Sequence, residues 1–108
     1  MHYPQYSPLH FAVQTGRIEV CKFVLERTRI ENPADENGFT PLHEAAQIGN
    51  LEICQSIICH ISNKNPMTNH KITPLDLAMK HDHLNVCLAI LVHLEDKNPA
   101  NHIGKLNL

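Results

Sequence analysis

The sequence predicts an all-α repeat solenoid, in which helix-turn-helix pairs stack side by side and β-hairpin loops project from them. Three features recur at a spacing of 33 residues: a Ser/Thr-Pro-Leu motif, a cysteine and an Asn-Pro pair. The motif begins at Ser7, Thr40 and Thr73; the cysteines are Cys21, Cys54 and Cys87; the pairs are 32–33, 65–66 and 98–99. A fixed period of this length is typical of stacked small units, each of which buries its apolar face against its neighbours.

Each unit begins with a short helix, and the second unit illustrates its signals. Thr40 is the natural N-cap, since its hydroxyl can accept a bond from an unpaired backbone N–H. Pro41 follows at the first helical position, where its missing N–H costs nothing. His43 stands three residues after the cap and can bond back to it, as in a capping box. Gly49 ends the helix in a left-handed conformation, whereas Asp82 stands at the equivalent place in the third unit and predicts a strained turn there.

The second helix of each unit carries a wide apolar stripe that indicates burial on one face. In the middle unit this stripe consists of Leu51, Ile53, Cys54, Ile57 and Ile58. The Asn-Pro pair then ends the helical stretch, because a residue before proline is pushed toward extended geometry. A hairpin loop follows, with Asn37-Gly38 predicted at its tip.

Composition excludes several classes of function. The chain has 108 residues, enough for one modest domain, and 9 basic against 11 acidic residues. Binding to nucleic acid needs a basic face, so we expect no nucleic-acid partner. The longest apolar run, 86–92, is far too short to cross a bilayer, and the first residues lack the pattern of a secretory signal. We therefore expect no membrane insertion and a cytoplasmic or other intracellular location.

The cysteines support a reducing compartment. Three of them occupy the same position of successive units, about 8–10 Å apart if the helices pack normally. A disulfide needs Cα atoms within about 7 Å, so we interpret these residues as small buried thiols.

The segment from Gly38 to Ile53, GFTPLHEAAQIGNLEI, resembles an ankyrin repeat. The resemblance covers almost the whole chain and divides one domain, 1–108, into units of approximately 2–34, 35–67 and 68–100 and a partial fourth, 101–108. It implies an L-shaped stack whose hairpin tips and first helices form a concave surface that binds another protein. It also implies that the hairpin asparagines, Asn32, Asn65 or Asn98, are candidates for hydroxylation.

Nothing in the sequence indicates catalysis. No nucleophile elbow, phosphate-binding loop or metalloprotease signature is present. His81, His83 and Cys87 are close enough in sequence for metal binding, but Cys87 holds a core position and no fourth ligand has suitable spacing. We expect no enzyme activity, no cofactor and no bound metal.

Positions that the repeat register turns outward are the candidate partner-binding residues. On the hairpins and first helices they are Tyr3, Tyr6, Gln14, Glu36, Asn37, Phe39, Gln47, Ile48, Asn69, His70, Ile72, Lys80 and His81. Tyr6, Phe39 and Ile72 are equivalent positions, one per hairpin. An exposed apolar row rimmed by polar residues is typical of an interaction patch. The alternative is that these three side chains pack against one another along the row of hairpins.

The sequence therefore predicts a non-catalytic protein-binding module whose partner is another protein. The alternative is a structural spacer, one segment of a longer array with no ligand of its own. The last second helix, LNVCLAILVHL, contains no charged residue, although the outer face of a terminal repeat is normally polar. We expect this C-terminal end to be covered by further repeats or by self-association.

Overall fold

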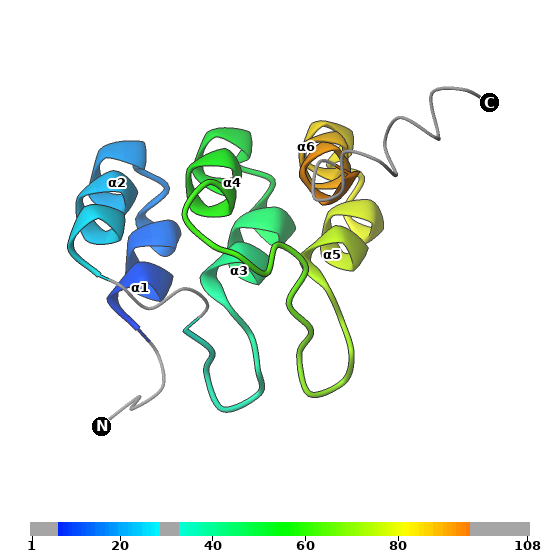
Figure 1. The fold of residues 1–108 in the computed structure, drawn as a ribbon, viewed down its shortest axis with the longest axis horizontal. Helices are drawn as coiled ribbons and strands as arrows, with labels where there is room; N and C mark the ends of the chain where they lie inside the picture. Colours follow the sequence, from blue (N-terminus) through cyan, green and yellow to red (C-terminus); the bar gives the residue numbers. More distant parts are fainter. Residues whose placement is uncertain (1–6, 29–32, 96–108) are drawn as a thin grey trace.

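The computed structural model describes residues 7–28 and 33–95 of the chain. These residues form three helix pairs that stand side by side along the long axis, with loops that project from one side of the stack (Figure 1). The helices are α1 (Pro8–Thr15), α2 (Ile18–Arg27), α3 (Pro41–Ile48), α4 (Leu51–Ile58), α5 (Pro74–Lys80) and α6 (Leu84–Glu95). The first helices of the units pack in one row and the second helices in another, through the contacts α1–α3–α5 and α2–α4–α6. The predicted helical solenoid is confirmed.

The start of each first helix has the predicted cap. The side chains of Ser7, Thr40 and Thr73 each accept the backbone N–H three residues on, and the side chain at that third position accepts the cap's own N–H in return. Proline follows each cap at the first helical position. Since the proline has no N–H, three unpaired donors remain at each helix start, and two of them are satisfied within a four-residue segment, which explains why such short helices begin sharply.

The turns between paired helices use a left-handed residue in every unit. Gly16 and Gly49 have φ of 71° and 88°, as the sequence predicts. Asp82 occupies the third turn with φ of 61°, which confirms the strained conformation expected there. An L-residue in this region costs about 1–2 kcal/mol, although aspartate tolerates it better than most.

No glycine follows α4, and a lysine takes over its role at this helix end. The Lys64 ammonium donates to the carbonyl oxygen of Ile58 at 2.8 Å and also to that of Ile61. The carbonyl groups at a helix C-terminus carry partial negative charge and lack partners in the helix, so a cation is favourable there.

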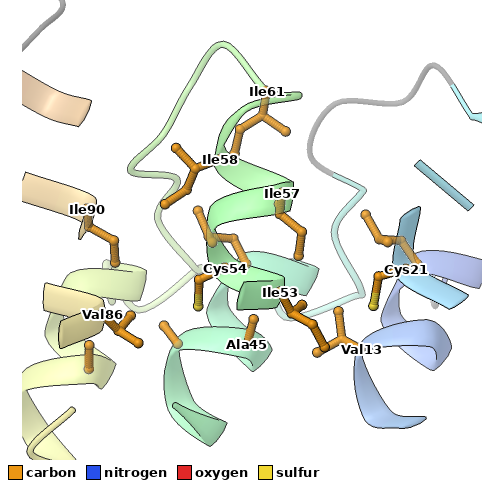
Figure 2. Close-up of a cluster of buried hydrophobic side chains, with 14 of the residues drawn as sticks. Val13, Cys21, Ala45, Ile53, Cys54, Ile57, Ile58, Ile61, Val86 and Ile90 are labelled. Atoms are coloured by element: carbon orange, nitrogen blue, oxygen red, sulfur yellow. The ribbon is translucent and has the colours of Figure 1, made fainter. Parts of the chain in front are cut away.

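The core runs through all three units as one cluster of side chains. Val13, Ile53, Ile57, Val86 and Ile90 are almost completely buried. Figure 2 shows Val13 of the first pair pointing toward Ile53 of the second, so the core lies between units as well as within them. A single unit could not bury this apolar surface alone, and the stack is therefore stabilised at the junctions between units as well as within each pair.

The loops between units turn tightly, but the described residues include no β-strand. In the loop between α2 and α3, the N–H of Gly38 donates to the carbonyl of Asp35, and the N–H of Asp35 donates to the carbonyl of Phe39. Gly38 has φ of 81°. The tip is therefore a three-residue turn of Glu36, Asn37 and Gly38, which contains the Asn37-Gly38 pair that the sequence predicts there. The pair suits this turn because its glycine takes the positive φ.

Candidate functional site

Each of the two described loop tips is held in shape by one side chain. Oδ1 of Asp35 accepts the N–H groups of Asn37 and Phe39, both at 2.9 Å. In the next unit, Oγ1 of Thr68 accepts the N–H groups of His70 and Ile72 in the same way. Short polar side chains of this kind bond readily to the backbone two residues on, and this fixes the turn. The tips are thus rigid although they project from the helices.

The two tips are also joined to each other. The backbone N–H of Asn69 donates to the carbonyl of Asn37 at 2.9 Å, and its side-chain amide donates to the carbonyl of Glu36 at 3.0 Å. The approach is so close that a Cβ atom on Gly38 would lie 2.9 Å from the backbone nitrogen of Asn69. Glu36, Asn37 and Asn69, three of the predicted contact residues, therefore lie side by side on one rim.

Buried histidines hold each loop against the preceding unit. Nε2 of His10 lies 2.8 Å from the carbonyl oxygen of Phe39, and Nε2 of His43 lies 2.7 Å from that of Ile72. Nδ1 of each ring accepts the N–H of its own cap residue, Ser7 or Thr40, so the proton resides on Nε2 and is donated to the carbonyl. Burial is the main cause that lowers the pKa of His43 from 6.5, because it disfavours the charged form.

The predicted contact residues are mostly exposed. Tyr3 and Tyr6 lie outside the described residues. Those that are exposed are Gln14, Glu36, Asn37, Gln47, Ile48, Asn69, His70, Ile72, Lys80 and His81. Ile48 and Ile72 supply apolar surface, with 53% and 38% of each residue exposed. Among the predicted contact residues, these two are therefore the exposed apolar side chains that a partner can reach.

Phe39 differs from the other predicted contact residues. It is half-buried, and its ring stacks on His43 with 5.2 Å between the centroids. Its backbone is bonded on both sides, to Asp35 and to His10. Phe39 therefore packs on the histidine of its own unit.

The predicted residues of the first helices lie apart from the tips. Ile48 is the last residue of α3, whereas Phe39 precedes its N-cap, so roughly one helix length, about 12 Å, separates them. Gln14 donates to a carboxylate oxygen of Glu44 at 2.9 Å, which ties α1 to α3. The candidate surface therefore extends from the tips along the first helices and is not a single pocket.

The histidines near the third turn have structural partners. The His81 and His83 rings stack, with 6.1 Å between centroids, and Nε2 of His83 lies 3.1 Å from the carbonyl oxygen of Gln47. Cys87 is buried in the core. Within residues 7–28 and 33–95 there is no group of three or more His, Cys, Asp or Glu side chains that could hold a metal ion.

The structure also bears on two other expectations, asparagine hydroxylation and the absence of membrane insertion. Oδ1 of Asn65 is buried without a hydrogen-bond partner, whereas Asn32 and Asn98, the other hydroxylation candidates, lie outside the described residues. None of the helices in the described part of the chain has the length and apolar character needed to span a bilayer.

Comparison with known families agrees with this geometry. The sequence model of one family, described as "Ankyrin repeats (3 copies)", matches residues 9–101. No curated protein matches the chain.

Proposed function

Because this chain belongs to the ankyrin-repeat family, whose members are generally protein–protein interaction modules, we propose that it is a non-catalytic module that binds another protein. The proposed surface is formed by the hairpin tips and the exposed side of the first helices. The observation that carries the proposal is the direct bonding of neighbouring tips, Asn69 to Asn37 and to Glu36, which presents a fixed rim.

A rigid surface favours binding for an energetic reason. Ordering a loop on association costs about 0.5–1.5 kcal/mol for each immobilised side chain. Here Asp35, Thr68 and the buried histidines that donate to the loop carbonyls already fix the backbone of both tips. The backbone of the tips therefore needs no further ordering when a partner arrives, and only the exposed side chains do, which favours binding.

The proposed roles of the contact residues follow their exposure. Ile48 and Ile72 are the apolar anchors, and around them stand the polar side chains of Gln14, Glu36, Asn37, Gln47, Asn69, His70, Lys80 and His81. An apolar centre with a polar rim is the usual anatomy of a protein interface. Phe39 contributes through His43, whose position it supports, and its exposed edge extends the apolar row. In sequence register Tyr6 belongs to the same row, and Tyr3 is equivalent to Glu36.

Paired affinity captures test this proposal. The immobilised wild-type chain is compared with a variant that combines Ile48→Glu and Ile72→Glu, and bound proteins are quantified by mass spectrometry. A matched control carries Phe23→Glu on α2, whose residue is 56% exposed and lies outside the proposed surface. We expect at least one protein to bind the wild type and the control but not the double variant.

The outcome also separates the two candidate functions. A structural spacer would retain no protein through this surface, so the wild type and the double variant would capture the same set. All three chains must unfold at similar temperatures for the comparison to count, which circular dichroism checks.

The remaining assignments are part of the same proposal. We propose that the protein is not an enzyme and needs no cofactor, in line with the generally non-catalytic family. We also propose an intracellular, reducing location, cytoplasmic or otherwise, since all four cysteines are free thiols.

The C-terminal end of the stack is a separate surface. There α6 exposes Leu84, Leu88, Leu91 and Val92. Contiguous apolar residues of this kind mark interaction sites on soluble domains. We propose that this end is covered, either by further repeats or by a second copy of the chain.

A further inference from the structure

An open apolar groove lies on the outer side of the first helix pair. It has a volume of about 440 Å³ and is lined by Pro8, Phe11, Ala12, Thr15, Val20 and Val24. Phe11 is 49% exposed, and Val20 and Val24 are half-buried. We refer to the five residues Pro8, Phe11, Ala12, Val20 and Val24 as the N-face.

The repeat register explains what this groove is built to receive. Val20 and Val24 correspond to Ile53 and Ile57 in the second unit and to Val86 and Ile90 in the third. All four of those equivalents are at most 1% exposed, because the preceding unit covers them. The N-face is thus the half of a junction that is covered at both internal junctions, whereas no preceding unit covers it within the described residues.

The complementary half of the same junction is open at the other end. Val13 and Leu25 lie on the side of the first unit that faces the second, and both are buried. Their equivalents in the third unit are Met79 and Leu91, which are 53% and 42% exposed. We refer to Met79 and Leu91 as the C-face. The chain therefore carries both halves of its own internal interface, one at each end.

At the C-face, a second copy fits better than a fourth unit does. His10 and His43 each donate to the carbonyl of the next loop, but Asp76 stands at their position, and a carboxylate has no proton to donate there. In register, Leu106 and Asn107 also replace the capping threonine and the proline. The histidine that would bond to the loop of a further unit is thus missing, and so is the cap of that unit's first helix. Helix-to-helix contact between the C-face and the N-face needs neither.

We propose that the chain self-associates head to tail, with the α5–α6 end of one copy seated on the α1–α2 groove of the next. The contact repeats the internal junction: Met79 takes the place of Val13 and meets Val20, and Leu91 takes the place of Leu25. Such an interface joins two different surfaces, so each copy can bind a further one, and association extends beyond a dimer to rings or open filaments. The hairpin tips stay free, which leaves the proposed partner surface accessible.

Sedimentation velocity of the 108-residue chain under reducing conditions tests this arrangement. We expect the weight-average mass to rise with concentration beyond that of a dimer, and to fall again on dilution. Val24→Lys blocks the N-face and Met79→Lys blocks the C-face, so each variant alone should be monomeric. An equimolar mixture of the two should form dimers and nothing larger, because one intact pair of faces remains.

The Val24→Lys variant on its own distinguishes this proposal from a symmetric dimer. If two copies paired through α6 alone, Val24→Lys would still self-associate, and that result would overturn head-to-tail association. A wild-type chain that stays monomeric at all concentrations, or a mixture that does, would overturn it as well. Lys22→Glu, on an exposed position of α2, is the matched control and should associate like the wild type. Circular dichroism verifies folding, and Phe11→Lys replaces Val24→Lys if the latter unfolds.

Discussion

Nε2 of His43 lies 2.7 Å from the carbonyl oxygen of Ile72, which is 29 residues further along the chain. The same imidazole accepts the N–H of Thr40 through Nδ1. One fully buried ring therefore satisfies a backbone donor of its own unit and a backbone acceptor of the next. The histidine both caps a helix and joins two repeats.

Replacing His43 by alanine should cost about 2–4 kcal/mol of unfolding free energy, because each buried backbone group left without its partner costs about 1–3 kcal/mol. Urea unfolding followed by circular dichroism measures the loss. His70→Ala at the exposed loop tip is the control and should change stability by no more than about 0.5 kcal/mol. Equal losses in the two variants would contradict the structural role of His43.

The stability of the chain should fall as the medium becomes acidic. Burial lowers the pKa of His43 in the folded state, so below about 6.5 the unfolded chain binds more protons than the folded one. The contribution is complete above pH 6.5 and is lost progressively as pH falls from there toward the folded-state pKa. Unfolding free energies of the wild type and of His43→Gln should therefore converge on acidification. Parallel pH profiles would refute this expectation.

The signals that sequence reasoning used well are local ones. The cap formed by Thr40 and His43 and the left-handed Gly49 depend on residues three or four positions apart, so the 33-residue period placed them correctly. The strained turn at Asp82 was predictable for the same reason. Burial of Ile53 followed from the apolar stripe, which a helix turns to one face.

The contacts that sequence reasoning missed depend on how the units stack. Nothing local to His43 says which carbonyl its second nitrogen meets, and nothing local to Lys64 says that its ammonium reaches the end of α4. The candidate surface shows the same limit. Exposure of Ile48 followed from the register, but the bonds from Asn69 to the neighbouring tip and the packing of Phe39 on His43 did not.

Gly49 should tolerate alanine less well than Gly16 does. Both glycines have positive φ, for which a Cβ atom costs about 1–2 kcal/mol. A Cβ on Gly49 would also lie 2.5 Å from the His83 ring, whereas one on Gly16 would meet nothing within 4 Å. Thermal and urea unfolding should therefore show a loss of about 1 kcal/mol for Gly16→Ala and on the order of 2–3 kcal/mol for Gly49→Ala. Similar losses would mean that the His83 ring moves aside freely.

Lys71→Gly should stabilise the chain. Lys71 has φ of 66° and occupies the position that Gly38 holds in the preceding loop. Relief of this conformation should contribute about 0.5–1 kcal/mol after the greater entropy of an unfolded glycine is subtracted. Glu36→Gly introduces the same residue where the backbone has ordinary geometry, so it should be neutral or destabilising. A destabilised Lys71→Gly variant would show that the lysine side chain makes a compensating contact.

Cys59 should be the one thiol that reacts in the native protein. Alkylation requires the thiolate, and burial raises the pKa of Cys54 to about 12 and also raises that of Cys21. Cys87 is buried as well, whereas Cys59 is exposed at the end of α4. Iodoacetamide at mildly alkaline pH followed by peptide mass spectrometry should therefore modify one site in the folded chain and all four in urea. Cys59→Ser should abolish the native reaction, and rapid labelling of Cys54 in the folded state would show that the helix pairs separate readily, contrary to the packing that joins the three units.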